Sequence, residues 1–232
     1  MACIEMNNLV KKYGSNEVLK NINLKFESGK IIGLLGPNGS GKTTLIKLLN
    51  GLIPTTSGEI LIDGSPVGIE SKKIISYLPE RTYLDNNMTV KECIDFFEDF
   101  YEDFNTPKAY QLIDKLNINH KKKLKTLSKG TKEKVQLILV MSRRAKIYIL
   151  DEPIAGVDPA SRDYILDTIM NNFEDGATLI ICTHLISDIE RILDEVVFLR
   201  DGNVVLYDNA DSVRDKYNGS IDEAFREVFR CY

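Results

Sequence analysis

A glycine-rich segment from Gly36 to Thr43 has the residue types and spacing that bind phosphate. It fits the pattern G-x-x-x-x-G-K-[ST], for which ordinary residue frequencies make a chance match about one per cent in a chain of this length. Glycines let consecutive backbone N–H groups approach a phosphate, Lys42 is expected to reach the β- and γ-phosphates, and Thr43 to ligate Mg²⁺. A structural turn is the alternative. The pattern predicts a purine nucleotide bound by Gly36, Pro37, Asn38, Gly39, Ser40, Gly41, Lys42, Thr43 and Thr44.

Two adjacent carboxylates, Asp151 and Glu152, follow a short apolar segment later in the chain. The carboxyl end of a parallel strand is where α/β folds place ligand chemistry. Asp151 can hold the Mg²⁺ that neutralises phosphate charge, and Glu152 can polarise the water that attacks the γ-phosphate. An Asp-Glu pair before a proline is more often a surface turn. The phosphate loop upstream favours the catalytic interpretation.

Alternating strands and helices are expected to position both groups. An apolar strand at residues 31–35 stops where the loop begins, and residues 43–52 have the spacing of a helix with one buried face. From residue 147 onward, strand and helix alternate, which predicts a parallel sheet. Asp201-Gly202 marks a hairpin. The other expected elements are strands at 22–26, 59–62, 74–78, 147–150, 178–182, 196–199 and 204–207, helices at 161–173 and 186–193, and two short helices at the C-terminal end.

A helical lobe is expected in the middle of the chain. The apolar period changes to 3.6 between Val90 and Phe104, and Thr106-Pro107 resembles a helix cap with a first-turn proline. A third helix should begin near Ser128, for which a capping role is the simplest interpretation. The lysines at 121–123 and 125 are typical of a solvated linker face.

Composition limits the classes of protein that this sequence can encode. The 232 residues are 43% hydrophobic and 28% charged, as in a globular chain with a sizeable core, and a net charge of −4 argues against a general electrostatic grip on nucleic acid. The longest apolar runs are too short to cross a bilayer, and the N-terminus has no secretory pattern, so a cytosolic protein is expected. The widely spaced cysteines (Cys3, Cys93, Cys182 and Cys231) favour reduced thiols.

The order and spacing of these motifs resemble those of the nucleotide-binding subunit of an ATP-binding cassette (ABC) transporter, over nearly the whole chain. Residues 127–131 (Leu-Ser-Lys-Gly-Thr) align with the family signature Leu-Ser-Gly-Gly-Gln, and residues 156–159 with its D-loop. The resemblance implies an α/β fold of the P-loop NTPase type, with a mixed-sheet core and an inserted helical lobe. It implies a single domain at 1–232, with the core at 1–84 and 143–209, the lobe at about 85–142 and C-terminal helices at about 210–232.

The resemblance also assigns roles to isolated residues. Ser128 and Gly130 would offer a hydroxyl and backbone N–H groups to the γ-phosphate on another subunit, so the family arrangement is a head-to-tail dimer with two ATP molecules. His184 matches the histidine that contacts the γ-phosphate and orients the water, although a lone histidine is more often structural. Tyr13 matches the aromatic residue that stacks on adenine, or is a plain surface aromatic. Asp158 would link the two sites across the dimer.

Three positions depart from the family pattern. Glu80 follows Tyr-Leu-Pro where the family has a glutamine that senses Mg²⁺ and the membrane subunit. A carboxylate there can still coordinate the metal, raise the affinity for it, or oppose the γ-phosphate. Lys129 and Thr131 replace Gly and Gln in the signature, and Lys129 adds positive charge near the phosphates. Slower or differently gated hydrolysis is one consequence.

The sequence therefore predicts a cytosolic ATPase subunit that binds ATP and Mg²⁺ and hydrolyses ATP. By resemblance, its partners are a second copy or a related ATPase subunit and two separately encoded membrane-spanning permease subunits, with no nucleic acid. Its place would be the cytoplasmic face of the membrane. The lysine-containing signature and the Tyr-Leu-Pro-Glu loop resemble those of exporter subunits of the ABC-2 type. The alternative is an ABC ATPase that acts as an ATP-gated clamp or in membrane signalling, without moving cargo.

Overall fold

Two sheets build the larger part of the molecule. The structure, a computed structural model, describes residues 2–230, without the side chains of residues 2 and 159–161. The first sheet is antiparallel, in the order β2-β1-β4-β5. The second has the order β10-β9-β3-β8-β7-β6, and its strands are parallel except β10. The strands are β1 (Ala2–Tyr13), β2 (Asn16–Glu27), β3 (Ile31–Leu35), β4 (Ser57–Ile62), β5 (Ser65–Pro66), β6 (Ile75–Leu78), β7 (Ile147–Asp151), β8 (Thr178–Cys182), β9 (Glu195–Arg200) and β10 (Asn203–Asn209).

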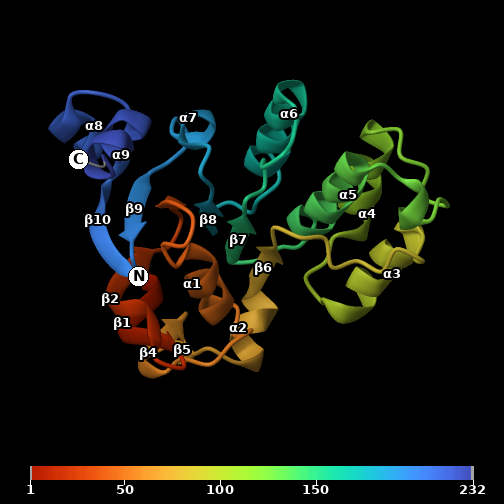
Figure 1. Cartoon of the computed structure of the whole chain (residues 1–232). Helices are drawn as coiled ribbons and strands as arrows, with labels where there is room; N and C mark the ends of the chain where they lie inside the picture. The colour runs from red at the N-terminus through yellow and green to blue at the C-terminus, as the bar shows by residue number, and fades with distance from the viewer. Residues whose placement is uncertain (1, 231–232) are drawn as a thin grey trace.

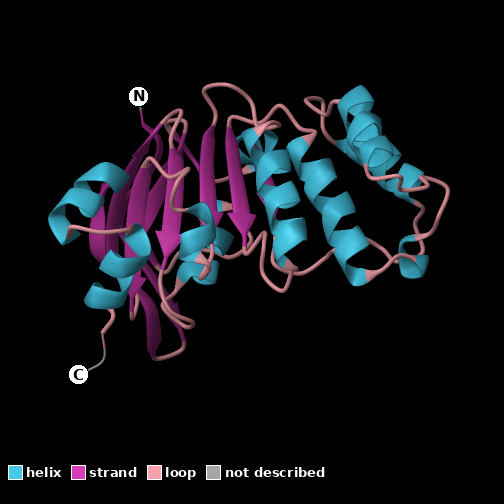
Figure 2. Cartoon of the chain, turned by 90° about the horizontal axis from the view of Figure 1, so that it is seen from above, coloured by secondary structure: helices cyan, strands magenta, loops and turns pink. Residues whose placement is uncertain are grey.

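Helices cover the second sheet and form a separate lobe. Helices α3, α4 and α5 lie to one side of the sheets, beyond β6, whereas α8 and α9 lie at the opposite end (Figure 1; Figure 2). The helices are α1 (Lys42–Leu49), α2 (Ile69–Ile74), α3 (Val90–Phe100), α4 (Thr106–Lys115), the 3₁₀ helix η1 (Leu124–Thr126), α5 (Lys129–Met141), α6 (Pro159–Met170), α7 (Ile186–Ile189), α8 (Ala210–Tyr217) and α9 (Ile221–Val228).

Three hydrophobic clusters hold these layers together. One fills the space between the two sheets and α1. A second lies under α5 to α9 on the other face of the parallel sheet. The third lies inside the lobe, between α3, α4 and α5. Every residue of β7 and β8 is buried, as expected for central parallel strands covered on both faces. This packing fixes the carboxyl ends of β3, β7 and β8 beside one another.

Several elements differ from the ranges expected from sequence. Helix α1 ends at Leu49 rather than at residue 52, because Gly51 takes a positive φ of 61°. Helix α3 ends at Phe100, and α7 has 4 residues instead of the expected 186–193. The cap of α4 is Asn105, whose side chain accepts from the Lys108 N–H, and not Thr106. Helix α2 lies between the strands expected at 59–62 and 74–78, in a stretch for which the sequence predicts no element. Residues 231 and 232 of the expected C-terminal helical segment, Cys231 included, lie outside the described range.

Candidate functional site

The predicted phosphate loop connects β3 to the first turn of α1. Its glycines are required by shape, since a Cβ on Gly36 would lie 2.3 Å from the Leu199 carbonyl oxygen, and Gly41 has a φ of 109°. That conformation is strained for any residue with a side chain. The loop therefore presents backbone N–H groups and a helix N-terminus to one small volume. Such a concavity suits an anion.

Lys42 turns its ammonium group back into this loop. The residue is 7% exposed, and its Nζ donates to the carbonyl oxygens of Gly36 at 2.6 Å and Pro37 at 3.1 Å. A buried lysine needs such partners because an unpaired charge is costly to bury. These two hydrogen bonds hold the ammonium group beside the loop. Its positive charge adds to an environment that suits a phosphate group.

Asp151 is the last residue of β7, beside Cys182 at the end of β8. It is 2% exposed. Burial raises the pKa of its carboxyl group, and the charges of Glu152 and Glu80 raise it further, while a hydrogen bond from Cys182 and the charge of Lys42 act against this. A cation at this position would offset that carboxylate charge. Carboxylate and hydroxyl oxygens are also the ligands that Mg²⁺ prefers, so Asp151, Glu80 and Thr43 form a suitable donor set.

Glu152 has an unusual backbone conformation that directs its carboxylate toward the residues after β8. Its φ is 52°, uncommon for a residue with a side chain, and its N–H donates to the Cys182 carbonyl oxygen at 2.7 Å. Thr183 Oγ1 donates to Glu152 Oε2 at 3.0 Å. His184 Nδ1 lies 3.0 Å from both carboxylate oxygens. The carboxylate and the imidazole thus form a pair able to share a proton.

A cavity of about 360 Å³ joins the loop to the ends of these strands. It brings together most of the residues that the sequence assigns to phosphate, metal and water. The lining also includes Val18, Ala155 and Cys182, which sequence reasoning did not single out. The predicted residues in the lining are Asn38, Gly39, Gly41, Lys42, Thr43, Thr44, Glu80, Asp151, Glu152 and His184.

Seven predicted nucleotide contacts are not part of this lining: Gly36, Pro37 and Ser40, which belong to the loop itself, and four residues from other parts of the chain. Tyr13 ends β1 with 49% of its surface exposed, and Lys11 Nζ lies 4.9 Å from its ring centroid. Ser128 caps α5, where its Oγ accepts from the Thr131 N–H at 3.2 Å, and Gly130 lies in the first turn. Asp158 is exposed before α6. One chain therefore brings together the phosphate loop and the carboxylates but not the signature.

Glu80 also borders a second cavity, of about 560 Å³, between α5 and the carboxylates. Lys129 and Gln136 of α5 are part of its lining. Gln136 is 3% exposed, and its Nε2 lies 3.5 Å from the Pro79 carbonyl oxygen. The loop that carries Glu80 thus adjoins both the carboxylates Asp151 and Glu152 and helix α5.

Sequence reasoning missed Cys182 and Thr183. Their signal is topological, because a residue ending β8 must lie beside Asp151 and Glu152 once β7 and β8 are neighbours. The hydrophobic pattern identified both strands but not their adjacency. The Thr183 hydroxyl, fully buried, also accepts from the Leu185 N–H at 3.1 Å. One side chain therefore contacts Glu152 and shapes the turn that carries His184.

No helix within residues 2–230 combines the length and the apolar character needed to span a lipid bilayer.

The chain matches known proteins over most of its length. The family model described as "ABC transporter" matches residues 19–155. The ATP-binding protein YtrB of an ABC transporter of Bacillus subtilis (strain 168) is 33% identical over 217 residues, covering 92% of this chain and 74% of that protein.

Two further comparisons agree with this assignment. The SkfA peptide export ATP-binding protein SkfE, also from Bacillus subtilis (strain 168), is 31% identical over 211 residues and covers 88% of each chain. A solved structure of the ATP-binding subunit of an ABC transporter superposes with a TM-score of 0.89 at 27% identity, covering 98% of this chain and all of that one. With the phosphate loop, the carboxylates and the fold in agreement, the chain belongs to the ABC transporter family as an ATP-hydrolysing subunit.

Proposed function

We propose that this chain binds MgATP, hydrolyses it in a head-to-tail dimer and drives export through membrane-spanning permease subunits encoded separately. The observation that carries the proposal is the cavity where Lys42, Asp151 and Glu152 meet. In it, Lys42 and the loop bind phosphate, and Thr43, Asp151 and Glu80 hold the metal. Mg²⁺ in such a site would neutralise charge on the phosphates. Glu152 accepts the proton of the attacking water, and His184 holds Glu152 and the γ-phosphate in place.

A second chain is needed to complete this site. Ser128 and Gly130 lie outside the cavity that holds Lys42, although their hydroxyl and N–H groups suit a γ-phosphate. In a head-to-tail pair, the signature of one chain covers the nucleotide on the other, and Asp158 lies near the junction. Tyr13 stacks on the adenine ring at the exposed end of β1. Closing and opening of this dimer is the step that ATP binding and hydrolysis drive.

An apolar groove between the core and the lobe supports a permease partner. The groove has a volume of about 810 Å³, and Leu52, Ile69, Tyr83 and Phe100 expose between 52% and 79% of their surfaces. Apolar side chains grouped on a surface mark interaction sites. Its remaining lining is Lys47, Asn50, Lys72, Lys73, Ile75, Tyr77, Pro79, Arg81 and Tyr101. A cytoplasmic segment of the permease fits this chemistry and would hold the ATPase at the cytoplasmic face of the membrane.

The similarity to SkfE, a peptide export ATP-binding protein, favours export as the direction of transport.

Glu152→Gln tests the catalytic assignment. The amide cannot accept a proton, so we expect the variant to bind MgATP, to lose steady-state hydrolysis by about a hundredfold or more, and to form a stable dimer that elutes early in size exclusion with MgATP. Lys42→Ala should instead lose nucleotide binding. Unchanged hydrolysis by the Glu152 variant would remove Glu152 as the base, and unchanged affinity in the Lys42 variant would remove the phosphate-loop assignment.

Co-purification separates transport from the clamp alternative. The tagged chain is extracted from native membranes in mild detergent, and every polypeptide recovered in stoichiometric amount is weighed by mass spectrometry. A multi-span protein in equal amount supports the transporter assembly. Ribosomal proteins, DNA or a soluble scaffold, without a membrane protein, would leave the ATPase in place and reject the export proposal.

A further inference from the structure

Helix α5 belongs to two hydrophobic cores at once. Val135, Ile138 and Leu139 pack inside the lobe, whereas Leu137 and Val140 pack in the cluster against the parallel sheet. The helix begins directly after the signature serine and has 13 residues, which makes it about 20 Å long. Anything that rotates or shifts its C-terminal end will therefore also move Ser128.

A single guanidinium group fixes that C-terminal end. Arg143 follows α5 and is 2% exposed. Its Nε and Nη2 donate to the two carboxylate oxygens of Asp103 at 2.9 and 3.0 Å. Nη1 donates to the Ile75 carbonyl oxygen, and Nη2 also donates to that of Lys73, both at 2.5 Å. The guanidinium carbon lies 3.8 Å from the ring centroid of Tyr101. Three separate segments of the chain thus meet at one side chain.

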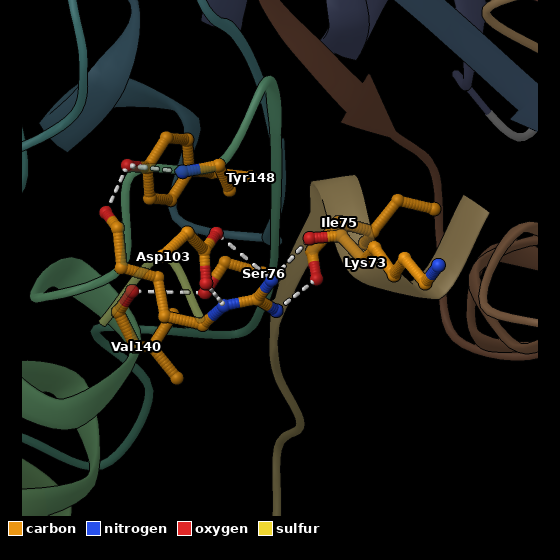
Figure 3. A network of polar contacts seen from close by, with 8 residues as sticks. Lys73, Ile75, Ser76, Asp103, Val140 and Tyr148 are labelled. Atoms are coloured by element: carbon orange, nitrogen blue, oxygen red, sulfur yellow. Dashed lines mark hydrogen bonds and ion pairs between the residues drawn. The ribbon is translucent and has the colours of Figure 1, made fainter. Parts of the chain in front are cut away.

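The backbone around Arg143 is held as well. Its carbonyl oxygen accepts from the Tyr148 hydroxyl at 2.6 Å, and Ser76 Oγ donates to the Val140 carbonyl oxygen at 2.8 Å. Figure 3 shows Lys73, Ile75, Ser76, Asp103, Val140 and Tyr148 converging from α2, β6, the α3–α4 connection, α5 and β7. The Asn105 N–H donates to the Ser142 carbonyl oxygen at 2.7 Å. The end of α5 is therefore attached both to the core and to the lobe.

Three of the residues that contact the Arg143 side chain also line the apolar groove. Lys73, Ile75 and Tyr101 line it, and Tyr101 stacks on the guanidinium group. A segment that enters the groove would touch residues that are directly bonded to the end of the signature helix. Only an arginine can join the Asp103 carboxylate to the two carbonyl oxygens in this way, because its planar guanidinium group has five N–H donors that point in fixed directions. The ammonium group of a lysine is a compact charge without this geometry.

We propose that Arg143 is a positioning residue for ATP hydrolysis, which fixes the signature helix relative to the groove and to β6. The proposal rests on the proposed function in one respect, that Ser128 of one chain completes the nucleotide site of another. Arg143 touches no nucleotide. Its loss should leave binding at the phosphate loop intact and should loosen the lobe relative to the core, so that the dimer closes less often on MgATP.

The test compares Arg143→Gln and Arg143→Lys with a matched control, Arg144→Gln, in which the adjacent arginine is exposed. We expect Arg143→Gln to keep its nucleotide dissociation constant within about twofold and to lower kcat about tenfold with little change in KM, the pattern of a lost interaction that only the reacting state uses. Arg143→Lys should recover part of the rate. In the Glu152→Gln background, Arg143→Gln should need more MgATP to dimerise, and Arg144→Gln should not.

A distance measurement reads the position of the lobe without requiring a dimer. Spin labels are introduced through a non-canonical amino acid at Lys115 in α4 and Lys216 in α8, both exposed. Arg143→Gln should broaden the distance distribution between them, and Arg144→Gln should leave it unchanged. If Arg143→Gln gives no cooperative thermal transition, Asp103→Asn replaces it in every measurement, because it keeps the size of the side chain and weakens the same pair.

The outcomes separate the two proposals. A folded Arg143 or Asp103 variant that matches Arg144→Gln in kcat, dimerisation and label distance overturns the inference. A fall in kcat with an unchanged distance distribution also overturns it, since the effect would not pass through the lobe. If the parent Glu152→Gln chain fails to dimerise, the proposed function fails instead, and the label distances still decide whether Arg143 fixes the lobe.

Discussion

The carboxyl group of Asp151 is buried at the end of β7, where its negative charge is unfavourable. Its pKa is raised by burial first and by Glu152 and Glu80 second. A carboxyl group whose pKa is raised in the folded state stabilises the protein below its ordinary pKa of 3.8 and loses that contribution as the pH rises through the folded value. The ionised aspartate therefore costs stability at neutral pH when no cation is bound. Such a cost fits the proposed role of Asp151 as a metal ligand.

Asp151→Asn should therefore stabilise the metal-free chain. In EDTA at about pH 7.5, we expect Tm to rise by about 2–4 °C, which is the shift that about 1 kcal/mol produces in a chain of this size. The gain should shrink as the pH falls toward about 4, because the Asp151 carboxyl group of the parent is then protonated as well. Mg²⁺-dependent hydrolysis should be lost. Thermal melts across pH, with and without Mg²⁺ and ATP, check both effects. A lower Tm for the variant in EDTA would contradict the charge argument.

Thr183 is a residue-scale test of how Glu152 is held. Thr183→Val removes the hydroxyl that donates to Glu152 and accepts from the Leu185 N–H, at nearly constant volume. Since a hydrogen bond to a charged group contributes about 1.5–3 kcal/mol, and part of it survives through His184, we expect kcat to fall about tenfold with KM unchanged. Thr183→Ser should restore most of the rate. Equal rates for the valine variant and the parent would show that His184 alone positions Glu152.

At the element scale, Ser128 has two possible roles that one pair of variants separates. It caps α5 through the Thr131 N–H, and it is the proposed γ-phosphate contact of the partner site. Ser128→Ala should cost about 1 kcal/mol of stability because the cap is lost, whereas Ser128→Asp keeps a capping oxygen and a favourable charge at a helix N-terminus. Chemical denaturation measures this difference.

Dimer formation then tells the cap from the phosphate contact. In the Glu152→Gln background, Ser128→Ala should dimerise less readily on MgATP, and Ser128→Asp less readily still, because a carboxylate repels the γ-phosphate. Full dimerisation of the aspartate variant would mean that Ser128 serves only as a cap. Light scattering coupled to size exclusion gives the dimer fraction directly.

The elements themselves show what the sequence could and could not predict. The predicted phosphate loop, Asp151 and Glu152 line one cavity, and the sequence could single them out because the proposed chemistry requires particular residue types at fixed spacing. Strand β1 and helix α2 were not, since Asn7-Asn8 and Lys11-Lys12 interrupt alternation in β1, where the pairing with β2 shifts register. Short α2 offers only 6 residues for a periodic pattern. The burial of Arg143 follows from segments that are far apart in sequence, and no local pattern indicates it.

At the scale of the whole molecule, the chain presents two surfaces that the proposed partners would cover. Neither Ser128 nor Gly130 lines the cavity with Lys42, and the groove between the core and the lobe exposes apolar side chains. The two surfaces meet at one loop, since Glu80 lines the cavity with Lys42 while Pro79, the residue before it, lines the groove. A partner in the groove and a nucleotide in the cavity therefore contact adjacent residues of the same loop. This adjacency gives a physical route between the two proposed partners.

Ile69→Asp tests the groove as the permease site. Ile69 begins α2 and is 79% exposed, so an aspartate there costs little stability and is even favourable in a first helical turn. Since burying an isoleucine contributes about 1.5–3 kcal/mol, we expect recovery of the multi-span partner to fall at least about tenfold, with the ATPase rate of the isolated chain unchanged. The control is Val205→Asp on β10, 42% exposed and outside the groove lining. Equal recovery with both variants would place the permease contact elsewhere on the molecule.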